Sequence, residues 1–185
     1  MLLIGITGTI GAGKGTIVDY LVRNKNFIHL SVRDFLIEEI KNRSMPVNRD
    51  SMVIVANDLR SKFSPSYIIE QLHKKALLSK KPAIIESIRN IGEVDYLRKQ
   101  PGFYLFAIDA DPEIRYKRIT IRQSETDRLG FEEFLMNEKR EMNSVDPNAQ
   151  NLSACIKVAD FLFNNDDTPE TLYLQIEKVL AQISS

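Results

Sequence analysis

Five short apolar runs recur along the chain and constrain its fold more than any other feature. They cover residues 2–7, 27–31, 83–87, 103–109 and 159–165 and show little alternation of apolar and polar side chains. Such runs are typical of strands buried on both faces of a parallel sheet. Longer stretches with helical spacing lie between them, at 16–23, 50–62, 65–79, 112–122 and 131–142. The alternation predicts an α/β fold of three layers, with a five-stranded parallel sheet and helices on both faces.

The length and the charge balance narrow the class of protein further. A chain of 185 residues without an internal repeat or linker predicts a single domain over residues 1–185. The 25 basic and 25 acidic residues cancel, which disfavours nucleic acid and membrane surfaces as partners. The lone Cys155 forms no internal disulfide, and the first apolar run is too short for a signal or membrane-spanning segment. We therefore expect a cytoplasmic protein with a small-molecule partner.

A glycine-rich segment, TGTIGAGKGTIVDYL, lies between the first predicted strand and the first predicted helix. Residues 8–14 match GxxxxGK in the strand–loop–helix context that a phosphate-binding loop requires. Bare backbone N–H groups can converge there on a polyphosphate, and the helix N-terminus and Lys14 add positive charge. The predicted nucleotide-binding residues of this loop, among which Lys14 is also catalytic, are Gly8, Thr9, Ile10, Gly11, Ala12, Gly13, Lys14, Gly15 and Thr16.

The loop departs from the commonest pattern directly after its lysine. Gly15 stands where a serine or threonine usually ligates magnesium, and the hydroxyl group comes one place later, at Thr16. This sequence pattern, GxxGxGKGT, resembles the loop of adenylate kinases and related nucleoside monophosphate kinases. The resemblance implies a P-loop kinase fold, ATP and Mg²⁺ as cofactors, and Thr16 as a magnesium ligand.

The stretch HLSVRDFLIEE, residues 29–39, resembles a second adenylate kinase segment, in which a strand ends in serine, an aspartate follows, and an arginine then binds the acceptor phosphate. Ser31 and Asp34 fit this pattern, but Ile37 takes the place of the arginine. Arg33 or Arg60 is then expected to supply the missing charge, within an acceptor-binding helical region at 32–80. Dephospho-coenzyme A kinases are similar in carrying an aspartate at the position of Asp34, which implies a catalytic base for a hydroxyl acceptor.

The run AIIESIR carries the next chemically informative residues. Glu86 ends a predicted central strand, at the edge where open α/β sheets bind ligands, and Arg89 follows three residues later. The pair resembles the D-x-R motif of phage-type deoxynucleoside monophosphate kinases. Glu86 is expected to hold Mg²⁺ through water, and Arg89 to bind the acceptor phosphate. The alternative is a structural ion pair between Glu86 and Arg89.

Three arginines share one face of the predicted helix at 112–122. Arg115, Arg118 and Arg122 lie at i, i+3 and i+7, where like charges repel unless an anion is present. In adenylate kinases and dephospho-coenzyme A kinases the matching helix leads into a lid, which here would be short and span 118–140. The resemblance implies that Arg118 and Arg122 bind the ATP phosphates and act in catalysis, and that Arg140 joins the acceptor site. The alternative is a solvated helix whose arginines pair with acidic residues, Glu113 and Glu138.

The chain's last strand and loop, ADFLFNNDD, resemble the segment that lines the adenine in these kinases, with Asn165 as a nucleotide-binding residue. Together the motifs predict an ATP-dependent small-molecule phosphotransferase, specifically a nucleoside or deoxynucleoside monophosphate kinase. Two alternatives remain open. One is phosphorylation of a hydroxyl group with Asp34 as base, as in dephospho-coenzyme A kinases, and the other is a non-catalytic, nucleotide-binding regulatory module.

Overall fold

The computed structural model describes residues 1–122, 130–146 and 148–183, and within them five parallel strands form one sheet. The strand order is β2-β3-β1-β4-β5. This confirms the predicted fold class. The strands are β1 (Leu3–Gly8), β2 (Ile28–Ser31), β3 (Ala83–Glu86), β4 (Phe103–Asp109) and β5 (Phe161–Asn164).

Burial follows strand position. Every residue of the central strand β1 is buried, because it pairs with β3 and β4 and is covered on both faces. The edge strands β2 and β5 have one neighbour each and expose part of their length, including His29. The continuous apolar runs therefore mark the inner strands more faithfully than the outer ones.

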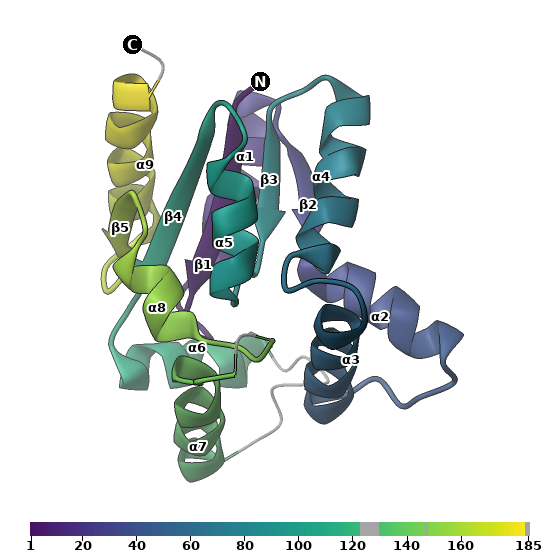
Figure 1. Ribbon diagram of the computed structural model, residues 1–185. Coiled ribbons are helices and arrows are strands. Elements are labelled where there is room, and N and C mark those ends of the chain that lie inside the picture. The colour runs from purple at the N-terminus through teal and green to yellow at the C-terminus, as the bar shows by residue number, and fades with distance from the viewer. Residues whose placement is uncertain (123–129, 147, 184–185) are drawn as a thin grey trace.

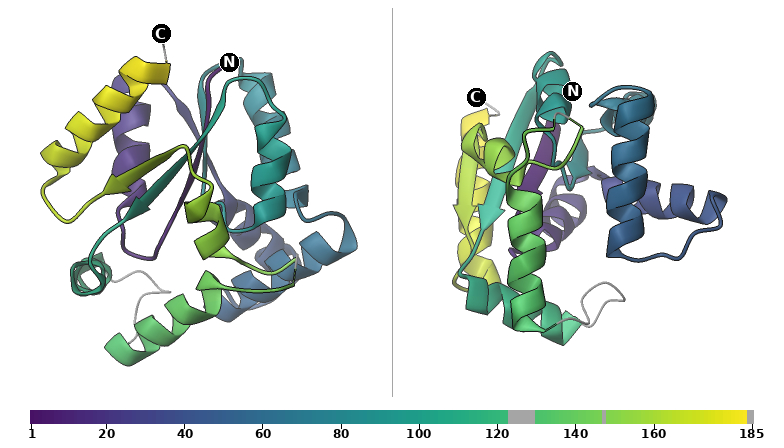
Figure 2. Two further views of the ribbon diagram at one scale, coloured as in Figure 1. Left: turned by 60° about the vertical axis from the view of Figure 1, so that its left-hand side comes forward. Right: turned by 60° about the horizontal axis from the view of Figure 1, so that its bottom comes forward.

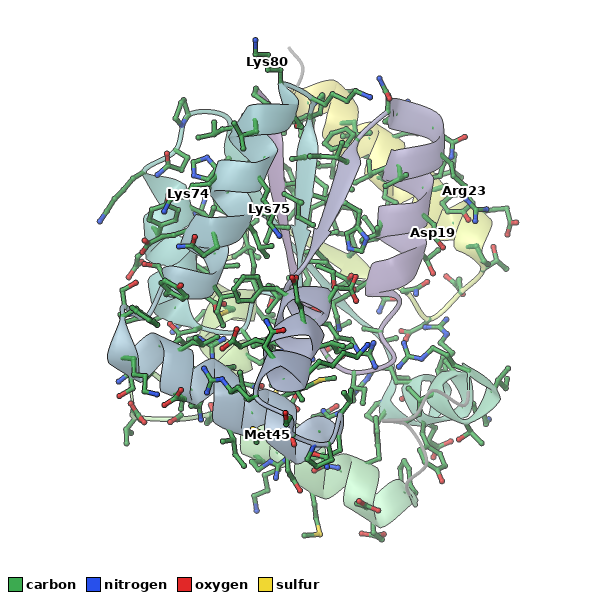
Figure 3. The ribbon with its side chains drawn as sticks, turned by 90° about the vertical axis from the view of Figure 1, so that its right-hand side faces the viewer. Asp19, Arg23, Met45, Lys74, Lys75 and Lys80 are labelled. Atoms are coloured by element: carbon green, nitrogen blue, oxygen red, sulfur yellow. The ribbon has the colours of Figure 1, made fainter. Side chains whose placement is uncertain are left out.

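Helices cover both faces of the sheet (Figures 1 and 2). On each face, the helices pack over a separate apolar cluster. On one face lie α1 (Lys14–Lys25) and α9 (Pro169–Ile183), which pack against each other. On the other face lie α4 (Tyr67–Ser79), α5 (Ile91–Arg98) and α8 (Leu152–Lys157). Charged side chains on the outer faces of α1 and α4 point to solvent, among them Asp19, Arg23, Lys74 and Lys75 (Figure 3).

Four further helices lie beyond the carboxyl ends of the strands (Figure 1). They are α2 (Val32–Asn42), α3 (Arg49–Lys62), α6 (Pro112–Arg122) and α7 (Phe131–Met142). Because ligands of open α/β sheets bind at this edge, these helices surround the expected site. The middle of the predicted lid, residues 123–129, lies outside the described residues. Among those described, no helix is long and apolar enough to cross a membrane.

The starts of the three helices α2, α5 and α8 are marked by side-chain caps and not by a clear helical periodicity of apolar residues. Ser31 Oγ accepts a hydrogen bond from the backbone N–H of Asp34 at 3.1 Å, and Asn151 caps α8 in the same way. Asn90 and Glu93 form a reciprocal capping box at the start of α5. The spacing of Ser31 and Asp34 is thus explained locally by helix capping.

Candidate active site

The phosphate loop is shaped by glycines with backbone angles that other residues rarely adopt. Gly8 has a φ of 144°, and a Cβ atom placed on it would lie 2.1 Å from the carbonyl oxygen of Ile108. Gly13 has a φ of 106° and caps α1. The first turn of α1 carries no acidic residue, and Gly13 supplies no side-chain cap. The positive end of this helix therefore faces the loop without a competing side chain.

Side chains from the neighbouring strands hold this loop in place. Asn165 donates a hydrogen bond from Nδ2 to the carbonyl oxygen of Ala12 at 2.7 Å, and Thr9 Oγ1 donates to Asp109 Oδ1 at 2.5 Å. Asn165 is buried and comes directly after β5. The structure thus places this predicted nucleotide-binding residue against the loop backbone.

Lys14 folds back under the loop that precedes it. Its Nζ donates to the carbonyl oxygens of Gly8 and Thr9, at 2.8 and 2.7 Å. Burial of the ammonium group, together with the positive charge of Arg89, lowers the pKa of Lys14 to about 7, although Glu86 and Glu141 oppose this shift. A lysine with this pKa is partly neutral near pH 7, and it takes up a proton when a bound anion raises its pKa.

Two cavities meet at Lys14. The first, of about 420 Å³, lies along the phosphate loop, and we call it the loop cavity; its lining is Gly11, Gly13, Lys14, Gly15, Thr16, Glu86, Arg118, Ile119 and Arg122. The second, of about 300 Å³, extends toward α2 and α3 and is called the helix cavity. Both are lined by Gly11, Lys14, Glu86 and Arg122. A group bound in one cavity therefore lies beside a group bound in the other.

The three arginines of α6 divide into two roles. Arg118 and Arg122 line the loop cavity, and the buried NH1 of Arg118 has no hydrogen-bond partner within the described part of the chain. Arg115 instead is buried, donates to the carbonyl oxygens of Ala110 and Ile10, and pairs with Glu138. Arg115 therefore pairs with Glu138 as the alternative expects, but it is buried rather than solvated and supports the loop from behind.

Glu86 lines both cavities at the end of β3. Its Oε2 is 3.0 Å from His29 Nε2. Burial favours the neutral acid, but the His29 hydrogen bond and the positive charge of Lys14 outweigh it, so the pKa of Glu86 lies below its ordinary value. Thr16 and Glu86 both line the loop cavity and offer oxygen donors. This donor set fits Mg²⁺, which usually takes one or two protein ligands and completes its shell with water and phosphate.

The helix cavity combines an apolar wall with basic groups. Ile10 of the phosphate loop is one apolar side chain of the lining, and the others come from α2 and α3: Val32, Leu36, Met52, Val53 and Ala56. Six basic and two acidic side chains also line it: Lys14, Arg33, Arg49, Arg60, Arg89, Arg122, Glu86 and Glu141. An anionic group attached to an apolar or aromatic body would match this lining.

The predicted acceptor arginines have different surroundings. Arg33 is exposed and lines the helix cavity. Arg60 also lines it, but is only 2% exposed and donates from Nε and NH2 to Glu93 Oε1, at 3.1 and 2.7 Å. Arg89 pairs with Glu141, whereas Glu86 contacts His29, so the alternative of a mutual Glu86–Arg89 ion pair is wrong.

Two other predicted residues lie away from the described cavity linings. Asp34 is exposed on α2, and its backbone N–H contacts the capping Ser31. Arg140 pairs with Asp50 at 3.1 Å near the surface. The structure therefore brings Lys14, Glu86, Arg89, Arg118 and Arg122 together but leaves Asp34 and Arg140 outside the group.

Among the residues of the helix cavity that sequence reasoning missed are Arg49, Glu141 and Gln150. Arg49 directly follows the capping Asn48, so the start of α3 was detectable, but nothing local indicates that its side chain faces a cavity. Glu141 ends a highly charged helical stretch whose other acidic residues are mostly exposed. No local pattern distinguishes it.

The glycine loop, the lysine beneath it and the parallel sheet with two cavities at its carboxyl edge define a P-loop protein with the kinase fold. The family model described as an AAA domain matches residues 4–146, and the chain belongs to this family. A UPF0200 protein of Methanocaldococcus jannaschii is 31% identical over 191 residues, covering 99% of this chain and 91% of that protein.

Solved structures agree on the fold. The protein TT1252 from Thermus thermophilus aligns with a TM-score of 0.62 and 19% identity, covering 98% of this chain and 97% of that one. Shikimate kinase from Bacteroides thetaiotaomicron aligns with a TM-score of 0.56 and 13% identity, covering 97% and 98%. At these identities the likeness establishes the architecture alone.

Proposed function

We propose that this protein is an ATP-dependent phosphotransferase whose acceptor is a small molecule carrying a phosphate group, namely a nucleoside or deoxynucleoside monophosphate. The observation that carries the proposal is the excess of basic over acidic side chains around the helix cavity, which opens onto Lys14. A phosphate acceptor is already nucleophilic and needs charge neutralisation more than a base. The apolar wall offers a surface for the nucleoside.

On this proposal ATP lies along the loop cavity. The loop N–H groups and Lys14 hold its phosphates, and Arg118 and Arg122 neutralise charge that develops during transfer. Asn165 fixes the loop that cradles these phosphates. Mg²⁺, held by Thr16 and through water by Glu86, would screen the phosphate oxygens. Residues 118–140 would act as a short lid.

The acceptor would lie in the helix cavity, within the region 32–80 and its neighbours. Arg33 and Arg89 line that cavity and are the proposed acceptor-binding residues. Arg60 contributes positive charge, but its Nε and NH2 groups already donate hydrogen bonds to Glu93. Its main effect would therefore be to shape the wall of the helix cavity. Arg140 would reach the acceptor only after leaving Asp50.

The hydroxyl-acceptor alternative has less support. It requires a carboxylate base at the acceptor, and the proposed base Asp34 is exposed and outside the described lining of the helix cavity. The Asp34→Asn variant is therefore expected to keep nearly full activity. A large loss in that variant would instead favour a hydroxyl acceptor.

The decisive experiment is a screen of ADP release with ATP, Mg²⁺ and a panel of ribo- and deoxyribonucleoside monophosphates. We expect acceptor-stimulated ADP release with at least one member, and its loss in Lys14→Met. Tight ADP binding without stimulation by any acceptor would favour the regulatory-module alternative. Stimulation by hydroxyl compounds alone, dephospho-coenzyme A included, would reject a phosphate acceptor.

A further inference from the structure

Glu141 places a buried carboxylate in the wall of the helix cavity. It is 4% exposed and lies near the end of α7. Its Oε1 accepts a hydrogen bond from Arg49 NH2 at 2.5 Å, and its Oε2 accepts one from Arg89 NH1. Arg49 begins α3, and Arg89 lies between β3 and α5. One carboxylate therefore bridges two arginines that come from separate parts of the chain, and the group keeps a net positive charge.

The two arginines are not saturated by this contact. A guanidinium group has five N–H donors, and Glu141 receives one bond from each arginine. Arg89 donates one more, to Gln150 Oε1 at 3.2 Å. Arg49 Nε is buried and has no hydrogen-bond partner among residues 1–122, 130–146 and 148–183. Buried donors are normally satisfied, so this cluster has unused capacity for an oxyanion.

The cluster also lies close to the point where phosphoryl transfer would occur. Lys14, Arg49, Arg89, Glu141 and Gln150 line the same cavity. Burial disfavours the ionised form of Glu141, but the positive charges of Arg89 and Arg49 outweigh it and hold the pKa of Glu141 below its ordinary value. Glu141 is thus an anion held among cations, in the cavity that the acceptor's phosphate would enter.

We propose that Glu141 occupies the subsite of the acceptor's phosphate, and that a phosphate monoester displaces it to bind between Arg49 and Arg89. This inference rests on the proposed function, because it names the group that the helix cavity takes. It makes Arg49 an acceptor-binding residue. It also makes Glu141 a specificity-determining residue, since every incoming anion must replace a carboxylate that is already paired.

Charge explains which anions can make this exchange. A carboxylate or a phosphodiester carries one negative charge, so its exchange for Glu141 brings no electrostatic gain. A phosphate monoester above its second pKa of about 6 carries two charges and three acceptor oxygens, which match two guanidinium forks. The native cluster therefore favours free dianions over free monoanions.

The inference is tested by calorimetric titration at pH 8 of protein saturated with Mg²⁺ and ADP, which keeps the loop cavity filled. The probes are methyl phosphate, a dianion, and dimethyl phosphate, a monoanion. The variant is Glu141→Gln, and the matched control is Glu133→Gln, the same change at an exposed residue of α7. Folding of each variant is checked by circular dichroism.

We expect Glu141→Gln to bind methyl phosphate about tenfold more tightly than the native protein, because no charge-assisted pair has to be broken. Dimethyl phosphate should bind measurably only to Glu141→Gln, and Glu133→Gln should match the native protein. Equal or weaker methyl phosphate binding in Glu141→Gln would overturn the inference, since a carboxylate that only orients the arginines would produce that result.

A second variant covers the case in which Glu141→Gln fails to fold. Arg49→Lys keeps the charge but loses the fork, and should weaken methyl phosphate binding about tenfold. Unchanged binding in Arg49→Lys would overturn the inference. Failure of the proposed function is distinguishable, because methyl phosphate binding does not depend on turnover: the displacement results would then appear without acceptor-stimulated ADP release.

Discussion

The titration of Lys14 makes nucleotide binding depend on pH. Its pKa is about 7 in the free protein, and bound phosphates should return it toward the ordinary 10.5. At pH 8 the free lysine is mostly neutral and the bound lysine charged, so MgADP binding should take up close to one proton. Affinity should be flat below pH 7 and fall about tenfold per pH unit above it.

Calorimetry in buffers of different ionisation enthalpy measures this proton uptake. The control is Lys14→Met, which preserves length and removes the titrating group. It should bind MgADP more weakly and take up no proton. If the native protein binds without proton uptake at pH 8, the lysine is already charged in the free state and the argument is incorrect.

Arg60 lines the helix cavity and also pairs with a buried carboxylate. Its guanidinium group is 2% exposed and pairs with Glu93, which is fully buried. Arg60→Met should lower the free energy of unfolding by about 3–5 kcal/mol, because the carboxylate of Glu93 loses its counter-charge in the interior. Urea denaturation measures the change. The exposed Lys62, paired with Asp58, supplies the control: Lys62→Met should hardly shift the midpoint, and an equal shift would contradict the prediction.

At the scale of elements, two glycines of one loop should respond in opposite ways to alanine. At Gly13 a Cβ atom would lie 2.2 Å from Asn165 Nδ2, and the φ of 106° is strained for alanine. Gly13→Ala should therefore lower the free energy of unfolding by about 1–3 kcal/mol and weaken MgADP binding. Gly15 lies in α1 with nothing within 4 Å of an added Cβ, so Gly15→Ala should raise stability by about 0.5–1 kcal/mol.

Chemical denaturation and ADP titration of both alanine variants provide the measurement. Similar losses of stability in both would show that the loop responds to any added side chain. The contrast would then not arise from the local geometry of Gly13.

The elements also explain how much the sequence could reveal. The strands and the phosphate loop were predictable because each signal is contiguous: an apolar run forms β1, and the loop residues 8–16 follow it directly. The short helices α5 and α8 depend on caps at Asn90 and Asn151. They contain too few residues to show a helical periodicity of apolar side chains in the sequence. Arg89 and Glu141 lie 52 positions apart, and Arg49 and Glu141 lie 92 apart. Such pairings depend on how α3 and α7 pack, which no local pattern encodes.

The whole molecule joins its two cavities around one set of residues. Gly11, Lys14, Glu86 and Arg122 line both, so one ligand with a phosphate chain in the middle can fill them together. A compound with two nucleosides joined by five phosphates should therefore bind more tightly than ADP, because the second half binds at no further cost in translational freedom. The phosphate chain would pass Lys14, and one nucleoside would meet the apolar wall of the helix cavity.

Thermal unfolding with Mg²⁺ reports this directly. A ligand at one hundred times its dissociation constant adds about 2.7 kcal/mol of stability, which for a chain of this size raises Tm by about 5–10 °C. At equal concentration the two-nucleoside compound should raise Tm further than ADP, and Lys14→Met should reduce both shifts. Arg89→Ala should reduce only the excess, because Arg89 lines the helix cavity and is absent from the described lining of the loop cavity. An excess shift that survives Arg89→Ala would place the second nucleoside elsewhere and reject the helix cavity as the acceptor site.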